Sequence, residues 1–99
     1  MSGKTYFIYI TTNPGKTVLY IGVTNDLKRR LQEHRMAQLD ERSSFTGGYL
    51  CYNLIYYEVY EDVNMAIARE TKLKKWSRAK KEALIATRNP KWRFLDNEI

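Results

Sequence analysis

Cysteine and histidine are nearly absent from this chain of 99 residues, which has one of each, Cys51 and His34. A single cysteine excludes an internal disulfide framework and a zinc site built from several cysteines. A single histidine excludes a His-x-x-x-His metal pair, and the sequence has no glycine-rich phosphate-binding loop. Cys51 stands between Leu50 and Tyr52, a setting typical of a packed, inert thiol.

Long apolar runs and targeting signals are also missing. No stretch approaches the ~18 apolar residues of a membrane span, and the segment Met1-Ser2-Gly3-Lys4-Thr5 matches neither a signal peptide nor a myristoylation site. A hydrophobic fraction of 43% is ordinary for a folded domain. We therefore expect residues 1–99 to form a single soluble domain of the reducing cytoplasm.

Positive charge is plentiful and unevenly spread. The chain carries +6, but residues 69–93 alone hold ten Lys and Arg against two acids, a net +8, so the rest sums to −2. A one-sided basic field attracts polyanions, nucleic acid first, although a solubilising helix face has the same composition. The candidate nucleic-acid-binding residues are Lys72, Lys74, Lys75, Arg78, Lys80 and Lys81.

Residue patterns predict three strands and three helices. Segments rich in β-branched and aromatic residues predict strands over 5–10, 18–23 and 53–60. Pro14-Gly15 predicts a type II turn that makes the first two a hairpin. Helices are expected over 26–38, 63–76 and 78–88, with N-caps at Asn25-Asp26, at Asp62 or Asn64, and at Ser77. Residues 40–50 have the composition of a polar loop.

The predicted order ββαβαα indicates an α+β fold in which helices flank a three-stranded antiparallel sheet. A hairpin centred on Pro14-Gly15 sets Tyr9 directly opposite Tyr20, with both phenols on one face. Gly22 points the same way and leaves that patch open to a ligand or to a closely packed backbone. An ordinary cross-strand aromatic pair is the more frequent reason for facing tyrosines.

Helical spacing puts three polar residues near apolar stripes. In the first helix, His34 falls within the apolar stripe, next to Leu27, and Arg30 lies at its shoulder, where a half-buried core histidine and a snorkelling arginine are the ordinary interpretations. In the second, Glu70 falls between Ala66 and Ile67. A carboxylate there is costly unless it is paired or metal-bound, so Glu70 is either a buried salt-bridge partner, for example of Arg30, or a site carboxylate.

Together these groups suit phosphodiester hydrolysis. One carboxylate can hold one Mg²⁺ that keeps several waters and takes the phosphate as ligand. An arginine neutralises the charge that develops in the transition state, and a phenol or imidazole relays the proton of the attacking water.

The sequence resembles the GIY-YIG nuclease superfamily in its small single-domain form. Phe7-Ile8-Tyr9 matches the family's first motif and Tyr20-Ile21-Gly22 matches the second in full. Arg30, ten residues after Tyr20, and His34 resemble the family's helix with its catalytic arginine and histidine. Ala68-Arg69-Glu70 resembles the segment with the metal-binding glutamate, and Asn89-Pro90-Lys91-Trp92 a closing motif whose asparagine supports the site.

The resemblance implies a one-metal endonuclease acting on DNA, in repair, mobile-element or restriction settings. Glu70 would hold one Mg²⁺ or Mn²⁺, Arg30 would stabilise the transition state, and either Tyr9 or Tyr20 would act as general base with help from His34. Two positions depart from the family. Phe7 replaces a glycine, and Val23 stands where some members carry a lysine, so we expect slow hydrolysis, because a phenol of pKa ~10 needs a nearby cation to act as base at neutral pH.

Two other functions remain open at this point. A nucleic-acid-binding module with little or no cleavage would use tyrosines as stacking surfaces for unpaired bases, the candidates being Tyr49, Tyr52, Tyr56, Tyr57 and Tyr60. A plain interaction domain with a cationic face is the third. Phosphate contacts position a duplex without reading its sequence, so a separate protein partner could supply specificity.

Overall fold

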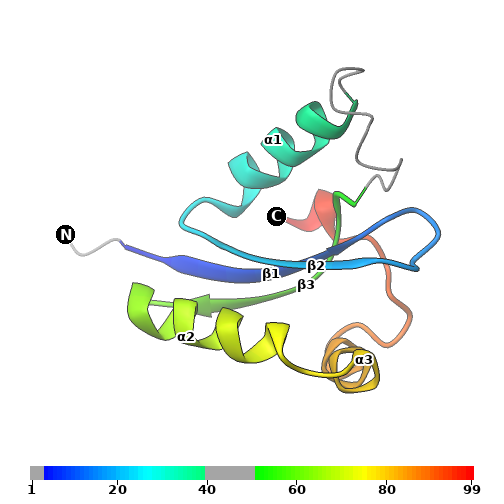
Figure 1. The fold of residues 1–99 in the computed structure, drawn as a ribbon. Helices are drawn as coiled ribbons and strands as arrows, with labels where there is room; N and C mark the ends of the chain where they lie inside the picture. The colour runs from blue at the N-terminus through cyan, green and yellow to red at the C-terminus, as the bar shows by residue number, and fades with distance from the viewer. Residues whose placement is uncertain (1–3, 40–50) are drawn as a thin grey trace.

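A three-stranded antiparallel sheet forms the centre of the protein, in a computed structural model that describes residues 4–39 and 51–99 (Figure 1). The strands are β1 (Tyr6–Thr12), β2 (Leu19–Thr24) and β3 (Asn53–Tyr60), in the spatial order β2-β1-β3. Both strands pair antiparallel to β1, which leaves β2 and β3 as the sheet edges. The predicted strands and the order ββαβαα are confirmed.

Helices cover both faces of the sheet. α1 (Leu27–Leu39) lies on one face, while α2 (Val63–Lys74) and α3 (Arg78–Ala86) lie on the other (Figure 1). Asp62 caps α2 and Ser77 caps α3, each accepting a hydrogen bond from a backbone N–H of the first turn. A short 3₁₀ turn, η2 (Asp96–Glu98), follows on the α1 side. The expected loop at 40–50 lies outside the described residues.

Strand alternation divides the core into two layers. Ile8 and Ile10 point toward α2 and α3, where they pack with Ile21, Ala66 and Leu73. The intervening Tyr9 points the other way and packs with Leu27 and Leu31 of α1 and with Leu54 of β3. Side chains of β1 therefore reach two separate environments, and only the odd-numbered ones face α1.

The hairpin register and its turn differ from the prediction. Tyr9 pairs with Gly22, and Tyr20 pairs with Thr11, so the tyrosines are diagonal neighbours. Pro14 and Gly15 do occupy the centre of a turn closed by Lys16 N–H donating to Asn13 O at 2.9 Å. The left-handed residue is Lys16, at φ 59°, and the glycine does not take that conformation as a type II turn requires. The residue numbers of paired positions sum to 31 instead of the predicted 29, and this shift of two residues keeps both phenols on one face.

The apolar stripe of α2 also differs. Val63 and Ile67, placed in the core by the helical projection, are 37% and 45% exposed. The buried residues are Ala66 and Leu73, so the helix is rotated about its axis relative to the prediction. In the described part of the chain, no helix is long and apolar enough to cross a membrane.

Candidate active site

The start of α1 sets the position of two candidate catalytic residues. Asp26 caps the helix by accepting a hydrogen bond from the backbone N–H of Arg29 at 3.2 Å. Leu27 and Leu31 are buried against the sheet and fix the rotation of the helix. Arg30 and His34, one turn apart, therefore lie on the same flank of α1, next to the buried stripe.

A chain of hydrogen bonds joins three of the predicted residues. Arg30 Nε donates to Tyr9 Oη at 3.4 Å, and Tyr9 Oη lies 3.2 Å from His34 Nε2. An arginine can only donate. When His34 carries its ring proton on Nδ1, Tyr9 Oη accepts from Arg30 and donates its own proton to His34 Nε2. The chain ends on a nitrogen that can take up a proton.

Tyr20 completes what we call the α1-face cluster, which consists of Tyr9, Tyr20, Arg30 and His34. Its ring centroid lies 6.2 Å from that of Tyr9 and 5.3 Å from that of His34. Tyr9 is 1% exposed, whereas Tyr20 is 40% exposed. Tyr20 is thus the phenol that meets solvent, and Tyr9 lies beneath it.

Gly22 has a different role from the one predicted. The patch it leaves is not open, because a Cβ at this position would overlap Tyr9 Oη and lie 2.5 Å from Tyr9 Cζ. The missing side chain makes room for the phenol of Tyr9, which crosses the space above Gly22 to reach His34. Glycine is needed here for this close approach.

Burial controls the acid–base properties of the cluster. It raises the pKa of Tyr9 above its ordinary value, and the hydrogen bond from Arg30 opposes this only in part. Burial, together with the charge of Arg30, lowers the pKa of His34. At neutral pH Tyr9 is therefore a neutral phenol that donates, and His34 is a neutral imidazole that accepts.

Glu70 lies apart from these four residues. It belongs to α2, which packs on the opposite face of the sheet, and its carboxylate pairs with Lys74 Nζ at 3.2 Å rather than with Arg30. Across residues 4–39 and 51–99, no hydrogen bond, ion pair or ring contact joins Glu70 to the α1-face cluster. The side chain is 19% exposed, so its carboxylate is half-buried yet open to solvent.

Glu58, a buried carboxylate on β3, is absent from the site residues predicted from the sequence. Its two oxygens accept from Arg69 Nε and Nη2, both at 3.0 Å, from Tyr56 Oη and from Tyr60 Oη at 2.7 Å. We call these residues the Glu58 cluster: Glu58, Tyr56, Tyr60 and Arg69. Burial pushes the pKa of Glu58 up, but these hydrogen bonds outweigh it and the pKa is lowered. Alternation along β3 was the available signal, since residues 56, 58 and 60 share a face.

The remaining candidates are placed as follows. Asn89 is buried, and its partners within the described residues are backbone groups: its Nδ2 donates to Ile55 O and Arg93 O, and its Oδ1 accepts from Arg93 N–H. It holds the segment after α3 against β3. Tyr56 is 3% exposed and so offers no stacking surface, and Tyr60 is half-buried with its hydroxyl bonded to Glu58. Tyr52 stacks with Arg35 at 5.0 Å, and Tyr57 packs edge-on against Phe7. Tyr49 lies outside the described residues.

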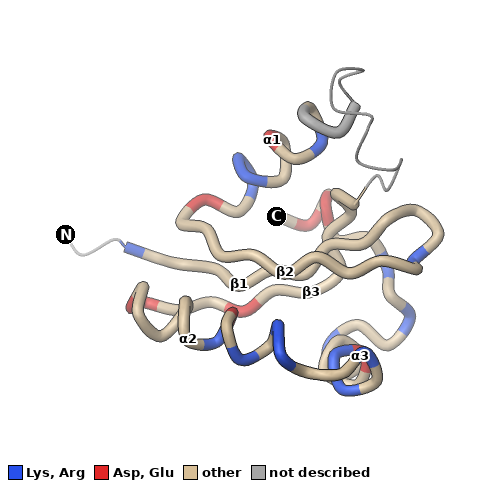
Figure 2. The backbone as a smooth tube through the Cα atoms, in the orientation of Figure 1, with Lys and Arg blue, Asp and Glu red and all other residues tan. Residues whose placement is uncertain are grey.

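Basic residues line the outer side of α2 and α3 (Figure 2). Lys72, Lys75 and Lys80 are exposed, and Lys80 Nζ lies 4.4 Å from the ring centre of Trp76. Arg78 is engaged elsewhere. Its guanidinium donates to Thr17 O at 2.6 Å and Lys16 O at 3.2 Å, and it pairs with Glu82, so it fastens the β1–β2 hairpin to α3. The nucleic-acid role predicted for Arg78 must therefore compete with this clamp.

A bound metal ion has limited support from the donor set. Among the described residues, no group of three or more histidine, cysteine, aspartate or glutamate side chains converges. Glu58 cannot serve, because both of its oxygens are occupied by donors. Glu70 has a single charged neighbour and solvent access, which fits an ion held by one carboxylate and otherwise by water.

Comparison with known proteins agrees with the sequence motifs. Residues 5–83 match the family model described as the GIY-YIG catalytic domain. The chain is 33% identical over 81 residues to a UPF0213 protein of Natronomonas pharaonis, covering 82% of this chain and 91% of that protein. It is 36% identical over 88 residues to a UPF0213 protein of Streptococcus pyogenes serotype M5, covering 88% and 91%.

A solved structure shares the fold. The solution NMR structure of the UPF0213 protein BH0048 from Bacillus halodurans superposes with a TM-score of 0.56 at 24% identity, covering 89% of each chain. At this identity the likeness bears on the architecture, namely the three-stranded sheet with helices on both faces.

Proposed function

We propose that this chain, which belongs to the GIY-YIG family, is a metal-dependent endonuclease that hydrolyses phosphodiester bonds of DNA. Membership in the family implies nuclease-type activity; the substrate, the ion and the residue roles are our proposal. The observation that carries it is the hydrogen-bond chain from Arg30 through Tyr9 to His34, beside the exposed phenol of Tyr20. A core cluster made only for packing has no need of a solvent-facing phenol over a neutral imidazole.

The proton of the attacking water leaves through the tyrosines. Tyr20, the exposed phenol, takes up the proton of the water and at the same time passes its own proton to Tyr9. The interaction with Tyr20 already raises the pKa of Tyr9. Tyr9 in turn transfers its proton to His34 Nε2, to which it already donates. The imidazole becomes an imidazolium, the hydroxide attacks phosphorus, and the bond to the leaving oxygen breaks.

Arg30 neutralises charge at the reacting phosphate. One of its nitrogens, Nε, holds Tyr9, and another, Nη1, pairs with Glu33 at 3.4 Å. The side chain is 42% exposed, so the remaining N–H groups of the guanidinium can reach a phosphate. Because Arg30 also contacts the relay, it couples the position of the phosphate to that of the proton path.

Glu70 is the residue we assign to the metal. A bound Mg²⁺ or Mn²⁺ would supply Lewis-acid polarisation of a phosphate oxygen. Glu70 pairs with Lys74 at 3.2 Å and keeps solvent access, so its carboxylate can be reached from the surface. α2 packs against the edge strand β2, which carries Tyr20, so in this proposal the reacting phosphate lies at the β2 edge of the sheet, where the two faces meet.

Lys72, Lys75 and Lys80, with Lys74 and Lys81, are the proposed phosphate contacts on the side of α2 and α3. Lys72 and Lys74 lie on α2 with Glu70, Lys75 caps that helix, and Lys80 and Lys81 lie on α3. The same surface supports a second candidate function, a nucleic-acid-binding module that cleaves little or nothing, because the cations of α2 and α3 lie on the sheet face opposite the α1-face cluster.

Nicking of supercoiled plasmid in Mg²⁺ or Mn²⁺ tests the proposal. We expect cleavage by the parent protein, loss of cleavage in EDTA and in Glu70→Ala, and retention in Glu61→Ala, which removes an exposed carboxylate next to α2. DNA binding in EDTA should persist in all three proteins. Binding without cleavage by any of them supports the binding module and contradicts the endonuclease.

A further inference from the structure

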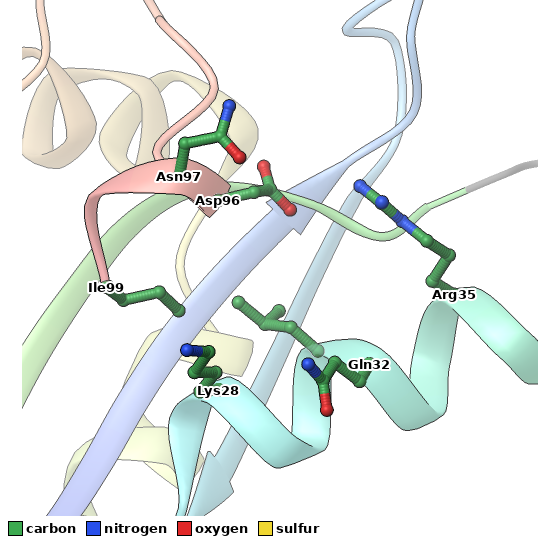
Figure 3. Close-up of a pocket in the computed structure, with 7 residues that line it drawn as sticks. Lys28, Gln32, Arg35, Asp96, Asn97 and Ile99 are labelled. Carbon is green, nitrogen blue, oxygen red and sulfur yellow. The ribbon is translucent and has the colours of Figure 1, made fainter.

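α1 has a second functional flank, facing away from the α1-face cluster. Lys28 and Arg30 are two residues apart and project about 200° apart around the helix. Lys28, Gln32 and Arg35 recur at i, i+4 and i+7 and form one wall of a pocket of about 220 Å³, whose other wall is the η2 turn (Figure 3). A single helix thus separates this pocket from the proposed active site.

The pocket combines polar groups of several kinds with an apolar floor. Leu31 is 6% exposed and lies at the base. Figure 3 shows the guanidinium of Arg35 directed toward Asp96, and Lys28 at the opposite end beside Ile99. Gln32 and Asn97 add amides that both donate and accept hydrogen bonds. The site therefore offers charge for a phosphate and matched donors and acceptors for the edge of a planar ring.

Two of the polar groups are held in place by the protein. Asp96 Oδ1 accepts from the backbone N–H of Leu54 at 3.0 Å, which fixes the carboxyl at the mouth of the pocket. The guanidinium of Arg35 stacks on the ring of Tyr52 at 5.0 Å. Burial raises the pKa of Asp96, so this end of the pocket is partly shielded from water. Preorganised polar groups over an apolar floor are typical of a ligand site.

From these features we infer that the pocket binds one unpaired nucleotide of the substrate strand, close to the phosphate that is cut. The inference rests on the proposed function for its substrate. The volume suits a single base with its phosphate and is too small for a base pair, and arginine planes and amide groups are the usual contacts of unpaired bases. A helix with its side chains is about 10–12 Å across, so the bound nucleotide lies within a few nucleotides of the cleavage point.

Binding of deoxynucleoside 5′-monophosphates, followed by amide chemical shifts of the ¹⁵N-labelled full chain in EDTA, tests this site. We expect dAMP or another of the four to shift the amides of Gln32, Arg35 and Asn97. Asn97→Ala and Gln32→Ala should each weaken binding about three- to tenfold. Asn64→Ala, an exposed asparagine on α2, is the matched control and should bind as the parent does.

Two probes separate a nucleotide site from its alternatives. Inorganic phosphate that shifts the same amides at the same concentration as dAMP would overturn the inference in favour of a plain anion site. A single-stranded oligonucleotide should shift these amides more than a blunt duplex of the same sequence, and equal shifts would contradict an unpaired nucleotide. Tyr20→Phe should bind dAMP as the parent protein does, because Tyr20 does not line the pocket. The nucleotide-binding result therefore stands even if the proposed cleavage fails, and the two failures can be told apart.

Discussion

Each face of the sheet carries a cluster of two tyrosines and one arginine around a fourth ionisable residue, but the two clusters differ in their hydrogen bonding. In the Glu58 cluster, the fourth residue is a carboxylate that accepts from every neighbour, and both phenols are bound as donors. In the α1-face cluster, it is a neutral imidazole at the end of an open chain, and Tyr20 remains exposed. The same residue types give a closed, saturated network on one face and a proton path with a solvent-facing end on the other.

The two clusters differ in whether the accepting residue can still take up a proton. Burial and the hydrogen bond to Glu58 raise the pKa of Tyr56 to about 12, so this phenol is fixed as a donor and Glu58 has no capacity left. The lowered pKa of His34 keeps its imidazole neutral at neutral pH, so it has not yet taken up a second proton and can still accept one. A saturated cluster stabilises the fold, whereas an unsaturated one can take part in chemistry.

The largest expected effect comes from removing the matched buried phenols one at a time. Tyr9→Phe breaks the relay between Arg30 and His34, and we expect the cleavage rate to fall about 10²- to 10⁴-fold. Tyr56→Phe removes a hydrogen bond to a charged group, so we expect a loss of about 1.5–3 kcal/mol in unfolding free energy and an unchanged rate. Plasmid nicking and urea unfolding of both variants measure the two quantities. Equal effects on rate would remove the distinction between the clusters.

Next in size is the stability effect of Glu58→Ala. This substitution leaves the half-buried Arg69 without its partner, and breaking an ion pair on one side costs up to about 3–5 kcal/mol when the pair is fully buried. His34→Ala, on the other face, should cost less, because a neutral imidazole leaves no unpaired charge behind. Urea unfolding at neutral pH gives both values. A larger loss in His34→Ala would mean that the α1-face cluster is the structural one.

Gly22→Ala and Gly15→Ala form a pair of smaller effect. A methyl at Gly22 meets the ring of Tyr9, so the phenol must move away from His34, and overpacking of this kind costs about 1–3 kcal/mol. Cleavage should fall with it. At Gly15 the nearest atoms are at 3.7 Å and 4.0 Å, so the change there should stay within about 0.5 kcal/mol and leave cleavage intact. A tolerated Gly22→Ala would show that Tyr9 can reach His34 by another route.

The smallest effects are expected from changes of pH, and the two clusters should lose stability in different pH ranges. Both His34 and Glu58 have lowered pKa values in the fold, so each favours the folded state at high pH, and this stability is lost as the pH falls. For His34 the loss of stability begins near its ordinary pKa of 6.5, and cleavage falls at lower pH, through the lowered pKa of the folded protein, because the imidazole must be neutral. For Glu58 the loss begins only near 4.5. Unfolding curves at pH 7, 5.5 and 4 should resolve two steps, and His34→Gln should abolish the upper one.

Local signals were enough to predict most of the fold. Asp62 and Ser77 cap their helices as expected, because a capping side chain bonds to its own helix. The strand at 53–60 was predicted at its observed limits. Tyr9 and Tyr20 share a face even though their pairing was wrong, because a shift of two residues preserves the side of the sheet. The sequence also predicted that Arg30 and His34 lie close together on α1, because they are about one helical turn apart.

The candidate site was predictable only in part, for a physical reason. Residue types, spacing and strand parity, written in the sequence itself, determined that two phenols, an arginine and an imidazole gather on one side of β1. The tertiary structure alone decided the rotation of α2, which exposes Val63 and Ile67. It also decided that Glu58 is the saturated carboxylate and that Arg78 clamps the hairpin. These depend on which elements pack together, since partners 11 and 61 residues apart meet only once the helices dock on the sheet.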